Sequence, residues 1–204
     1  MNFEDLNLHD WVSNPGLIAL ALVIVIGVAA WINRTSLSRA WQSWRTGRLL
    51  NNLGLKQICN LPCPDGLDGE FMLDRLVMLP DEIVLIVFKR YPGNIYCAEK
   101  ISQWTQVLAQ KSYKFENPLF ELENQRTALA GLIPGIPVRG YLFFDHSAFF
   151  PKGCPDGVMF PGNIPDKFSQ RDGLEVENRI TAAWEILARL SSESTPHQQL
   201  RLKT

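Results

Sequence analysis

The chain has 204 residues, a formal net charge of −1 at pH 7 and four cysteines. The near-neutral charge excludes a bulk electrostatic attraction to polyanions. The cysteines are too few for a disulfide scaffold, and their spacing matches none of the common zinc patterns, so we predict reduced thiols. Once an N-terminal anchor is set aside, roughly 140 residues remain, which is the size of one ordinary domain.

The N-terminal region contains a long uncharged segment between Asp10 and Arg34. About 20 apolar residues in helical conformation span the hydrocarbon layer of a bilayer. Trp11 and Trp31 stand near its two ends, where interfacial aromatic side chains are expected. We therefore predict a transmembrane helix over residues 12–33, preceded by a short segment 1–11. A cleaved signal peptide is the alternative, but it requires a basic N-terminal region, which is missing here.

The residues that follow this segment are basic. Residues 34–58 carry five Lys or Arg side chains and no Asp or Glu. The positive-inside rule therefore places the N-terminus outside and the C-terminal domain in the cytoplasm, at the inner or plasma membrane. The same cations are also suited to contact anionic lipid head groups. We predict a basic juxtamembrane helix over residues 34–54.

The rest of the chain alternates strands and helices. We predict a domain over 55–191, with a flexible tail over 192–204. Its predicted elements, in chain order, are a strand at 55–61, a loop at 62–69, strands at 70–79 and 82–89, a helix within 115–132 that begins at Asn117-Pro118, strands at 138–144 and 157–160, and a helix at about 174–191. This order predicts an α/β (α+β) class, a mixed sheet flanked by helices.

Charged residues stand within or at the ends of both apolar strands, and we single out one in each. Asp74 stands within the strand at 70–79, and Lys89 ends the strand at 82–89. A charge in an apolar strand needs a partner or a function. Strand alternation puts Glu70 on the same face as Asp74, so the two carboxylates and Lys89 converge if the two faces meet. The alternative is an ion pair of Asp74 with Lys89 or with Arg75.

This layout resembles the PD-(D/E)xK nuclease superfamily, and within it the nuclease-related domain (NERD) family. The motifs that carry the resemblance are Asp74, the strand from Ile83 to Lys89, Gly93-Asn-Ile-Tyr96, Trp104, Asn117-Pro118 and Val138 to Phe144, and they cover about residues 70–165. The resemblance implies that Asp74 and Lys89 are catalytic, that Asp74 ligates Mg²⁺, and that the metal activates water for phosphodiester hydrolysis.

The sequence departs from the family pattern where the metal ligands are expected. The position of the metal-binding Glu holds Val87, which cannot ligate Mg²⁺. The early Gly-Glu falls at Gly47-Arg48, and the paired Gln and His of the helix after Asn-Pro are Glu121 and Gln125. Two replacements for the lost carboxylate are open, Glu70 and Glu121. Glu70 lies roughly 13 Å from Asp74 by strand rise.

Three functions remain in view. The first is a membrane-anchored NERD-like protein with a degenerate site and weak or no nuclease activity, which binds nucleic acid or a protein partner. The second is an active Mg²⁺-dependent nuclease with a relocated carboxylate. The third is a non-enzymatic membrane assembly or docking protein. The sequence shows no phosphate-binding glycine loop and no sign of a small-molecule substrate.

Overall fold

The computed structural model describes residues 15–16, 19–20, 22–25, 27–28, 45–64, 69–169 and 175–201, with side chains to residue 193. The chain divides into two compact units, Met1–Arg45 and Thr46–Thr204. The described residues between 15 and 28 are helical and exposed. Most of the predicted transmembrane segment 12–33 lies outside the described residues, as do residues 34–44 of the predicted juxtamembrane helix. Within the part that is described, no helix has both the length and the apolar character needed to cross a bilayer.

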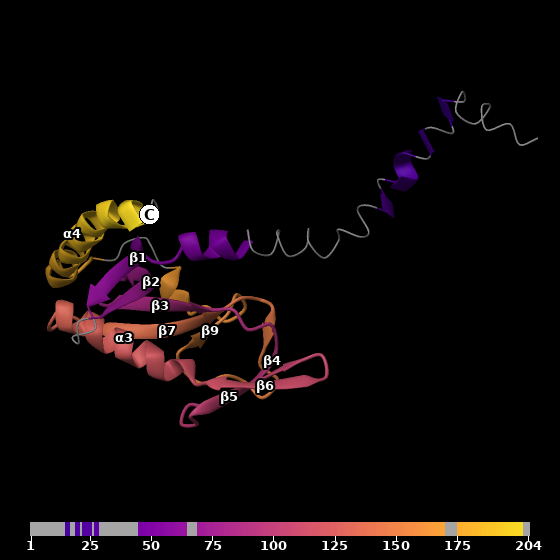
Figure 1. Ribbon diagram of the computed structural model, residues 1–204. Coiled ribbons are helices and arrows are strands. Elements are labelled where there is room, and N and C mark those ends of the chain that lie inside the picture. Colours follow the sequence, from indigo (N-terminus) through magenta and orange to yellow (C-terminus); the bar gives the residue numbers. More distant parts are fainter. Residues whose placement is uncertain are drawn as a thin grey trace, which may run out of the picture. The chain divides into compact units, whose positions relative to one another are not determined.

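A five-stranded mixed sheet forms the centre of the second unit (Figure 1). Its strand order is β1 (Lys56–Pro64), β2 (Glu70–Met78), β3 (Ile83–Lys89), β7 (Val138–Phe144) and β9 (Val158–Met159). The first three strands are antiparallel neighbours, whereas β7 runs parallel to β3 and β9 runs parallel to β7. The two strands predicted at 70–79 and 82–89 thus form an antiparallel hairpin, and the predicted mixed sheet is confirmed. β3 is central and almost wholly apolar, as a strand buried on both faces must be.

The edge strand β1 is longer than we predicted. It continues to Pro64, three residues into the segment predicted as a loop. Pro62 and Pro64 fit into this strand because β1 lies at the edge of the sheet, where a missing N–H breaks no ladder. Residues 65–68 of the predicted loop lie outside the described part.

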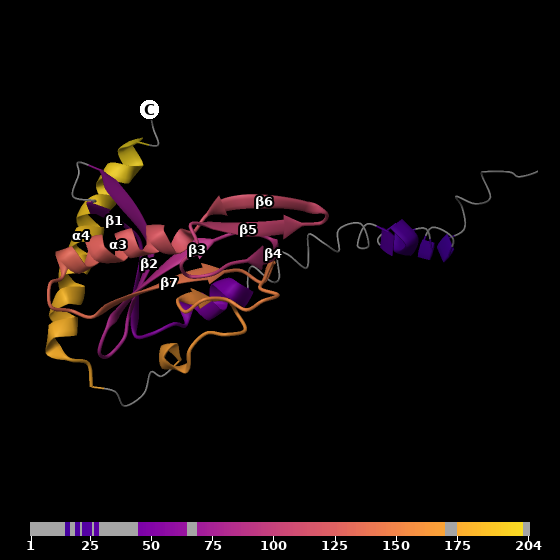
Figure 2. The ribbon, with the colours of Figure 1, turned by 90° about the horizontal axis from the view of Figure 1, so that it is seen from below.

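Each face of the central sheet is covered by a separate apolar cluster. On one face, β3 residues such as Leu85 and Val87 pack with α3 (Pro118–Leu132) and α4 (Asn178–Arg201). On the other face, Val84 and Ile86 pack with Leu50 of the helical segment 45–51 and with Phe168 of the 3-10 helix Asp166–Phe168. Helices therefore flank both faces of the sheet (Figures 1 and 2).

A buried carboxylate fastens the 3-10 helix to this second face. Glu82 is buried and accepts from Lys167 Nζ at 2.5 Å and from Arg139 Nε at 3.1 Å. Lys167 also lies over the ring of Tyr141, and Tyr141 contacts Phe168 edge to face. The two cations compensate the burial of the Glu82 carboxylate, which would otherwise be costly.

A second sheet of four strands was missed by the sequence reasoning. Its order is β6 (Lys111–Glu116), β5 (Gln103–Leu108), β4 (Gly93–Tyr96) and β8 (Ala148–Phe149). The turn between β5 and β6 is Ala109-Gln110, with Ala109 at φ 54°. Hairpin turns of this length normally carry Asn-Gly or Asp-Gly, so the usual sequence signal is absent. Trp104 and Ile95 are fully buried and join this sheet to the core of the domain.

Of the two long helices, α3 begins and ends as predicted, whereas α4 ends later than predicted. α3 begins at Pro118, and the side chain of Asn117 accepts a hydrogen bond from the Leu119 N–H, as predicted for an N-cap. α4 continues to Arg201, beyond the predicted end at residue 191. The prediction stopped where the apolar periodicity stops, but a helix can continue as a polar one beyond the segment that packs on β1.

Candidate functional site

The hairpin of β1 and β2 changes its pleat at the position of Asp74. In β1, Ile58 and Leu61 are three residues apart yet enter the same apolar cluster, and Asn60 between them has φ 53°. In β2, Leu73 and Leu76 show the same three-residue spacing in that cluster. Regular alternation allows only even spacings on one face, so both strands switch faces at this level. Asp74 therefore lies at a break in the strand and not in its regular part.

The carboxylate of Asp74 takes over a backbone position at this break. The β2–β3 ladder ends at the pair Arg75–Ile86, and its next step would set Asp74 opposite Val87. Instead, Asp74 Oδ2 accepts a hydrogen bond from the Phe88 N–H at 2.7 Å. The side chain thus satisfies an N–H that the departing strand leaves without a carbonyl partner. This is a structural task for a residue that we predicted as a metal ligand.

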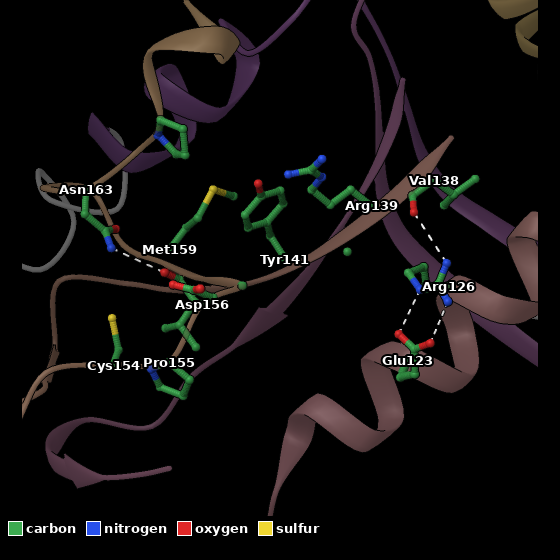
Figure 3. A pocket seen from close by; sticks show the side chains of 14 residues that line it. Glu123, Arg126, Val138, Arg139, Tyr141, Cys154, Pro155, Asp156, Met159 and Asn163 are labelled. Atoms are coloured by element: carbon green, nitrogen blue, oxygen red, sulfur yellow. Dashed lines mark hydrogen bonds and ion pairs between the residues drawn. The ribbon is translucent and has the colours of Figure 1, made fainter. Parts of the chain in front are cut away.

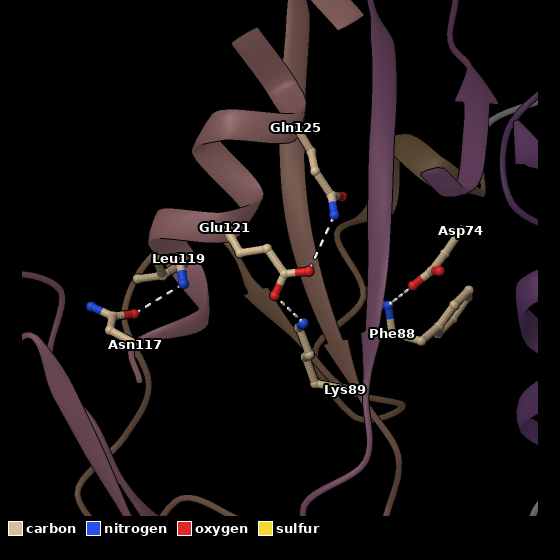
Figure 4. A network of polar contacts seen from close by, with 7 residues as sticks. All are labelled: Asp74, Phe88, Lys89, Asn117, Leu119, Glu121 and Gln125. Carbon is tan, nitrogen blue, oxygen red and sulfur yellow. Dashed lines mark hydrogen bonds and ion pairs between the residues drawn. The ribbon is translucent and has the colours of Figure 1, made fainter. Parts of the chain in front are cut away.

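Lys89 points to the other side of β3, toward α3 (Figure 4). Its ammonium lies 2.5 Å from Glu121 Oε2, and its side chain is only 17 % exposed against 50 % for Glu121. Gln125, one turn further along α3, donates from Nε2 to Glu121 Oε1 at 3.2 Å. The structure therefore brings together Lys89, Glu121 and Gln125. Asp74 is not part of this network, and the alternative of an Asp74 ion pair is not seen: Arg75 bonds to Asn51 and Gln57 instead.

The position of Glu121 follows from the way α3 is anchored. Asn117 caps the helix and also donates from Nδ2 to the carbonyls of Glu99 and Ile101, at 3.0 and 2.8 Å. Further along, Leu122 packs directly on Gly140 of β7, where an added Cβ would lie 2.9 Å from the leucine side chain. Only glycine permits this close approach, which sets the height of α3 above the sheet. Together the two contacts place Glu121 over the end of β3.

A cleft opens beside the Lys89–Glu121 ion pair. It has a volume of about 610 Å³, and Tyr91, Phe71 and Phe120 supply its aromatic lining. A second hollow, of about 720 Å³, lies between α3, β7 and the segment 154–165, and contains Arg126 and Arg139 (Figure 3). Both arginines there are already paired, with Glu123 and Glu82 respectively. Of these two cavities, the cleft at Lys89 is the one that contains a predicted catalytic residue.

The residues present do not form a Mg²⁺ site. Among the residues that the structure describes, no three His, Cys, Asp or Glu side chains come together. Val87 is 3 % exposed and packs in the apolar cluster beneath α3. Glu70 is exposed at the start of β2, and the Glu121 carboxylate is neutralised by Lys89. Mg²⁺ requires several oxygen ligands in near-octahedral geometry, and this donor set does not offer them.

The family of the chain follows from a match to a known family model. The family model described as "Nuclease-related domain", NERD, matches residues 38–145, which is more than half of the chain. The chain belongs to the NERD family. The matched segment runs from residue 38 through β7, and so includes both residues of the Lys89–Glu121 pair. No similarity to a curated protein or to a solved structure was found.

Membership of the NERD family confirms the resemblance read from the sequence. The sequence pattern predicts roles for Asp74, Lys89 and Glu121, but it groups Lys89 with Asp74, whereas the structure pairs Lys89 with Glu121. The sequence reasoning missed the role of Gln125, which is 5 % exposed and has an unpartnered Oε1 within the described structure. The available signal was the spacing of four between Glu121 and Gln125, which puts both on one face of α3.

Proposed function

We propose that this NERD-family protein binds nucleic acid, and that its degenerate PD-(D/E)xK site hydrolyses the bound nucleic acid weakly or not at all. The observation that carries the proposal is the state of Lys89. The side chain that should act on a phosphate is saturated by Glu121 at 2.5 Å, and the neighbouring ligand position holds the buried Val87. Each change removes one requirement of metal-dependent hydrolysis, a free cation and a second carboxylate.

The electrostatics of the Lys89–Glu121 pair support the same proposal. The side chains of Lys89 and Glu121 are 17 % and 50 % exposed, so water screens their attraction only partly. An incoming phosphate must therefore compete for Lys89 with the Glu121 carboxylate, which the chain already holds beside it. The proposal therefore expects weak binding at Lys89 itself. Binding affinity has to come from other surfaces of the domain.

The decisive experiment compares the full-length protein in detergent with four variants in a Mg²⁺-dependent cleavage assay. Wild type, Asp74→Ala and Lys89→Ala are expected to give the same background rate. Val87→Glu restores a carboxylate on the face of Lys89, and Val87→Glu combined with Glu121→Gln also releases the lysine. Cleavage by the double variant supports a degenerate enzyme with intact site geometry. Cleavage by wild type that Asp74→Ala abolishes would overturn the proposal.

One observation favours the second candidate, an active nuclease with a relocated carboxylate. Glu121 reaches the end of β3 and so supplies an acid close to the missing one. The same assay separates the two functions, because an active enzyme of this kind loses its Mg²⁺-dependent activity in Glu121→Gln. With a degenerate site, in contrast, wild type already cleaves only at the background rate, and Glu121→Gln leaves that rate unchanged.

The proposal places the domain at the cytoplasmic face of the inner or plasma membrane. Support comes from the uncharged segment over 12–33 and from the five cations that follow it. Alkaline carbonate extraction and protease treatment of intact spheroplasts test this location. Release of the protein by carbonate, or its digestion from outside, would contradict it. If the anchored protein binds no nucleic acid at all, the docking function replaces the one proposed here.

A further inference from the structure

The second sheet has an outer face that points away from the core. Two rows of cross-strand neighbours form it. The first row is Lys114–Thr105–Tyr96, and the second is Ser112–Val107–Asn94–Phe149. Paired residues share a face of a sheet, so these side chains all stand on the same side. The buried residues Trp104 and Ile95 alternate with them and point the other way, into the core.

The outer face carries one highly exposed aromatic side chain, Phe149, and one half-buried one, Tyr96. Phe149 is 62 % exposed, whereas Phe143 and Phe144 of the preceding strand are 1 % and 0 % exposed. Tyr96 is half-buried, and Lys152 lies 5.9 Å from the centroid of its ring. Phe149 pairs with Asn94, two residues before Tyr96, which puts the two aromatic positions roughly 8 Å apart from strand spacing and rise.

The charges of the outer face are arranged around these rings. Lys114 is exposed at one end of the Tyr96 row, and Lys152 stands at the other. Hydroxyl and amide groups lie between them and offer further hydrogen bonds. One acid, Glu116, lies on the same face next to α3, where it and Gln103 also line the cleft that contains Lys89. The outer face is therefore continuous with that cleft.

We propose that the outer face binds single-stranded nucleic acid, with bases stacked on Tyr96 and Phe149 and phosphates at Lys114 and Lys152. A sheet face with one exposed ring, one half-buried ring and flanking cations is suited to this ligand, because every unpaired base offers a π-face and every nucleotide a phosphate. A duplex hides the faces of its bases and cannot use the rings. The inference rests on the proposed function and names its substrate class.

The same hairpin supplies matched controls on its opposite face. Lys111 pairs with Leu108 and Tyr113 pairs with Gln106, and this set alternates with the outer-face residues. Lys111 and Tyr113 are both exposed. They therefore repeat the residue types of the outer face, in the same two strands, on the side that the proposed ligand does not touch.

The experiment measures binding of a fluorescein-labelled single-stranded oligothymidylate to the full-length protein in detergent, by anisotropy with EDTA present. Tyr96→Leu and Phe149→Ala are each expected to weaken binding at least about fivefold, from the usual contribution of a stacked base. Lys114→Gln and Lys152→Gln are expected to lower the salt slope by about 0.7 each. Glu116→Gln should tighten binding. Tyr113→Leu and Lys111→Gln should bind as wild type does, and all variants should keep the wild-type melting temperature within a few degrees.

Each outcome bears on a separate proposal. Equal losses in the outer-face variants and in the controls, or tighter binding of the corresponding duplex, would overturn the outer-face inference and leave the proposed function standing. Asp74-dependent cleavage on addition of Mg²⁺ would overturn the degenerate-site proposal, while the EDTA measurements still judge the outer face. No binding of nucleic acid by wild type would overturn both.

Discussion

Replacing Asp74 with alanine tests whether this residue supports the fold or the chemistry. The carboxylate accepts the Phe88 N–H at 2.7 Å, at a break where β2 leaves β3. Alanine removes the acceptor. Because this hydrogen bond is exposed and Phe88 is 36 % exposed, water can replace part of the lost bond, and the cost falls near the low end of the usual range, about 1–1.5 kcal/mol.

The matched substitution is Asp74→Asn, which keeps an acceptor oxygen in nearly the same place. We expect it to cost less than half as much as alanine. For a unit of this size each kcal/mol lowers the melting temperature by about 2–4 °C, so the alanine variant should melt about 3–5 °C lower and the asparagine variant about 1–2 °C lower. Thermal unfolding followed by circular dichroism measures both, with Asp156→Ala as the control for loss of an exposed carboxylate.

Two results would refute this reasoning. If Asp74→Asn destabilises as much as Asp74→Ala, the hydrogen bond to Phe88 is not what the carboxylate supplies. If neither variant changes stability but both abolish Mg²⁺-dependent cleavage, Asp74 is a metal ligand, as the sequence pattern alone predicts.

Three further predictions concern packing, buried charge and thiol reactivity. Gly140→Ala should lower the free energy of unfolding in urea by about 1–3 kcal/mol, because the new Cβ meets Leu122. Gly131→Ala in α3 has open space around it and should be neutral or stabilising. The reverse order would contradict the close contact at Gly140. Glu82→Gln should cost about 1–2 kcal/mol, less than a fully buried pair because Arg139 is 62 % exposed; no loss would show that the two ion pairs are not stabilising. Burial raises the pKa of the Cys97 thiol to about 11. At pH 8 iodoacetamide should therefore alkylate the exposed Cys59 first, and labelling of Cys97 should accelerate only as the pH rises toward that pKa. Equal labelling rates of the two cysteines at pH 8 would contradict this.

Local sequence patterns determined the elements that carry the site. The apolar run of β3 and the Asn117-Pro118 start of α3 depend on neighbouring residues alone, and both were predicted correctly. The order of motifs was also enough to predict the NERD family. The absence of a ligating side chain at residue 87 needs no structure, because valine has no donor atom.

Tertiary structure alone decided which charges meet. Alternation along β2 and β3 predicted that Asp74 and Lys89 converge, but the pleat breaks at Asn60 and Asp74 in two strands at once, so alternation cannot be carried across that point. The partner of Lys89 is 32 residues away, on a helix whose height depends on Gly140. Sequence patterns report the conformation of nearby residues. Ion pairs and sheet faces depend instead on how distant segments pack, and it is this packing that pairs Lys89 with Glu121.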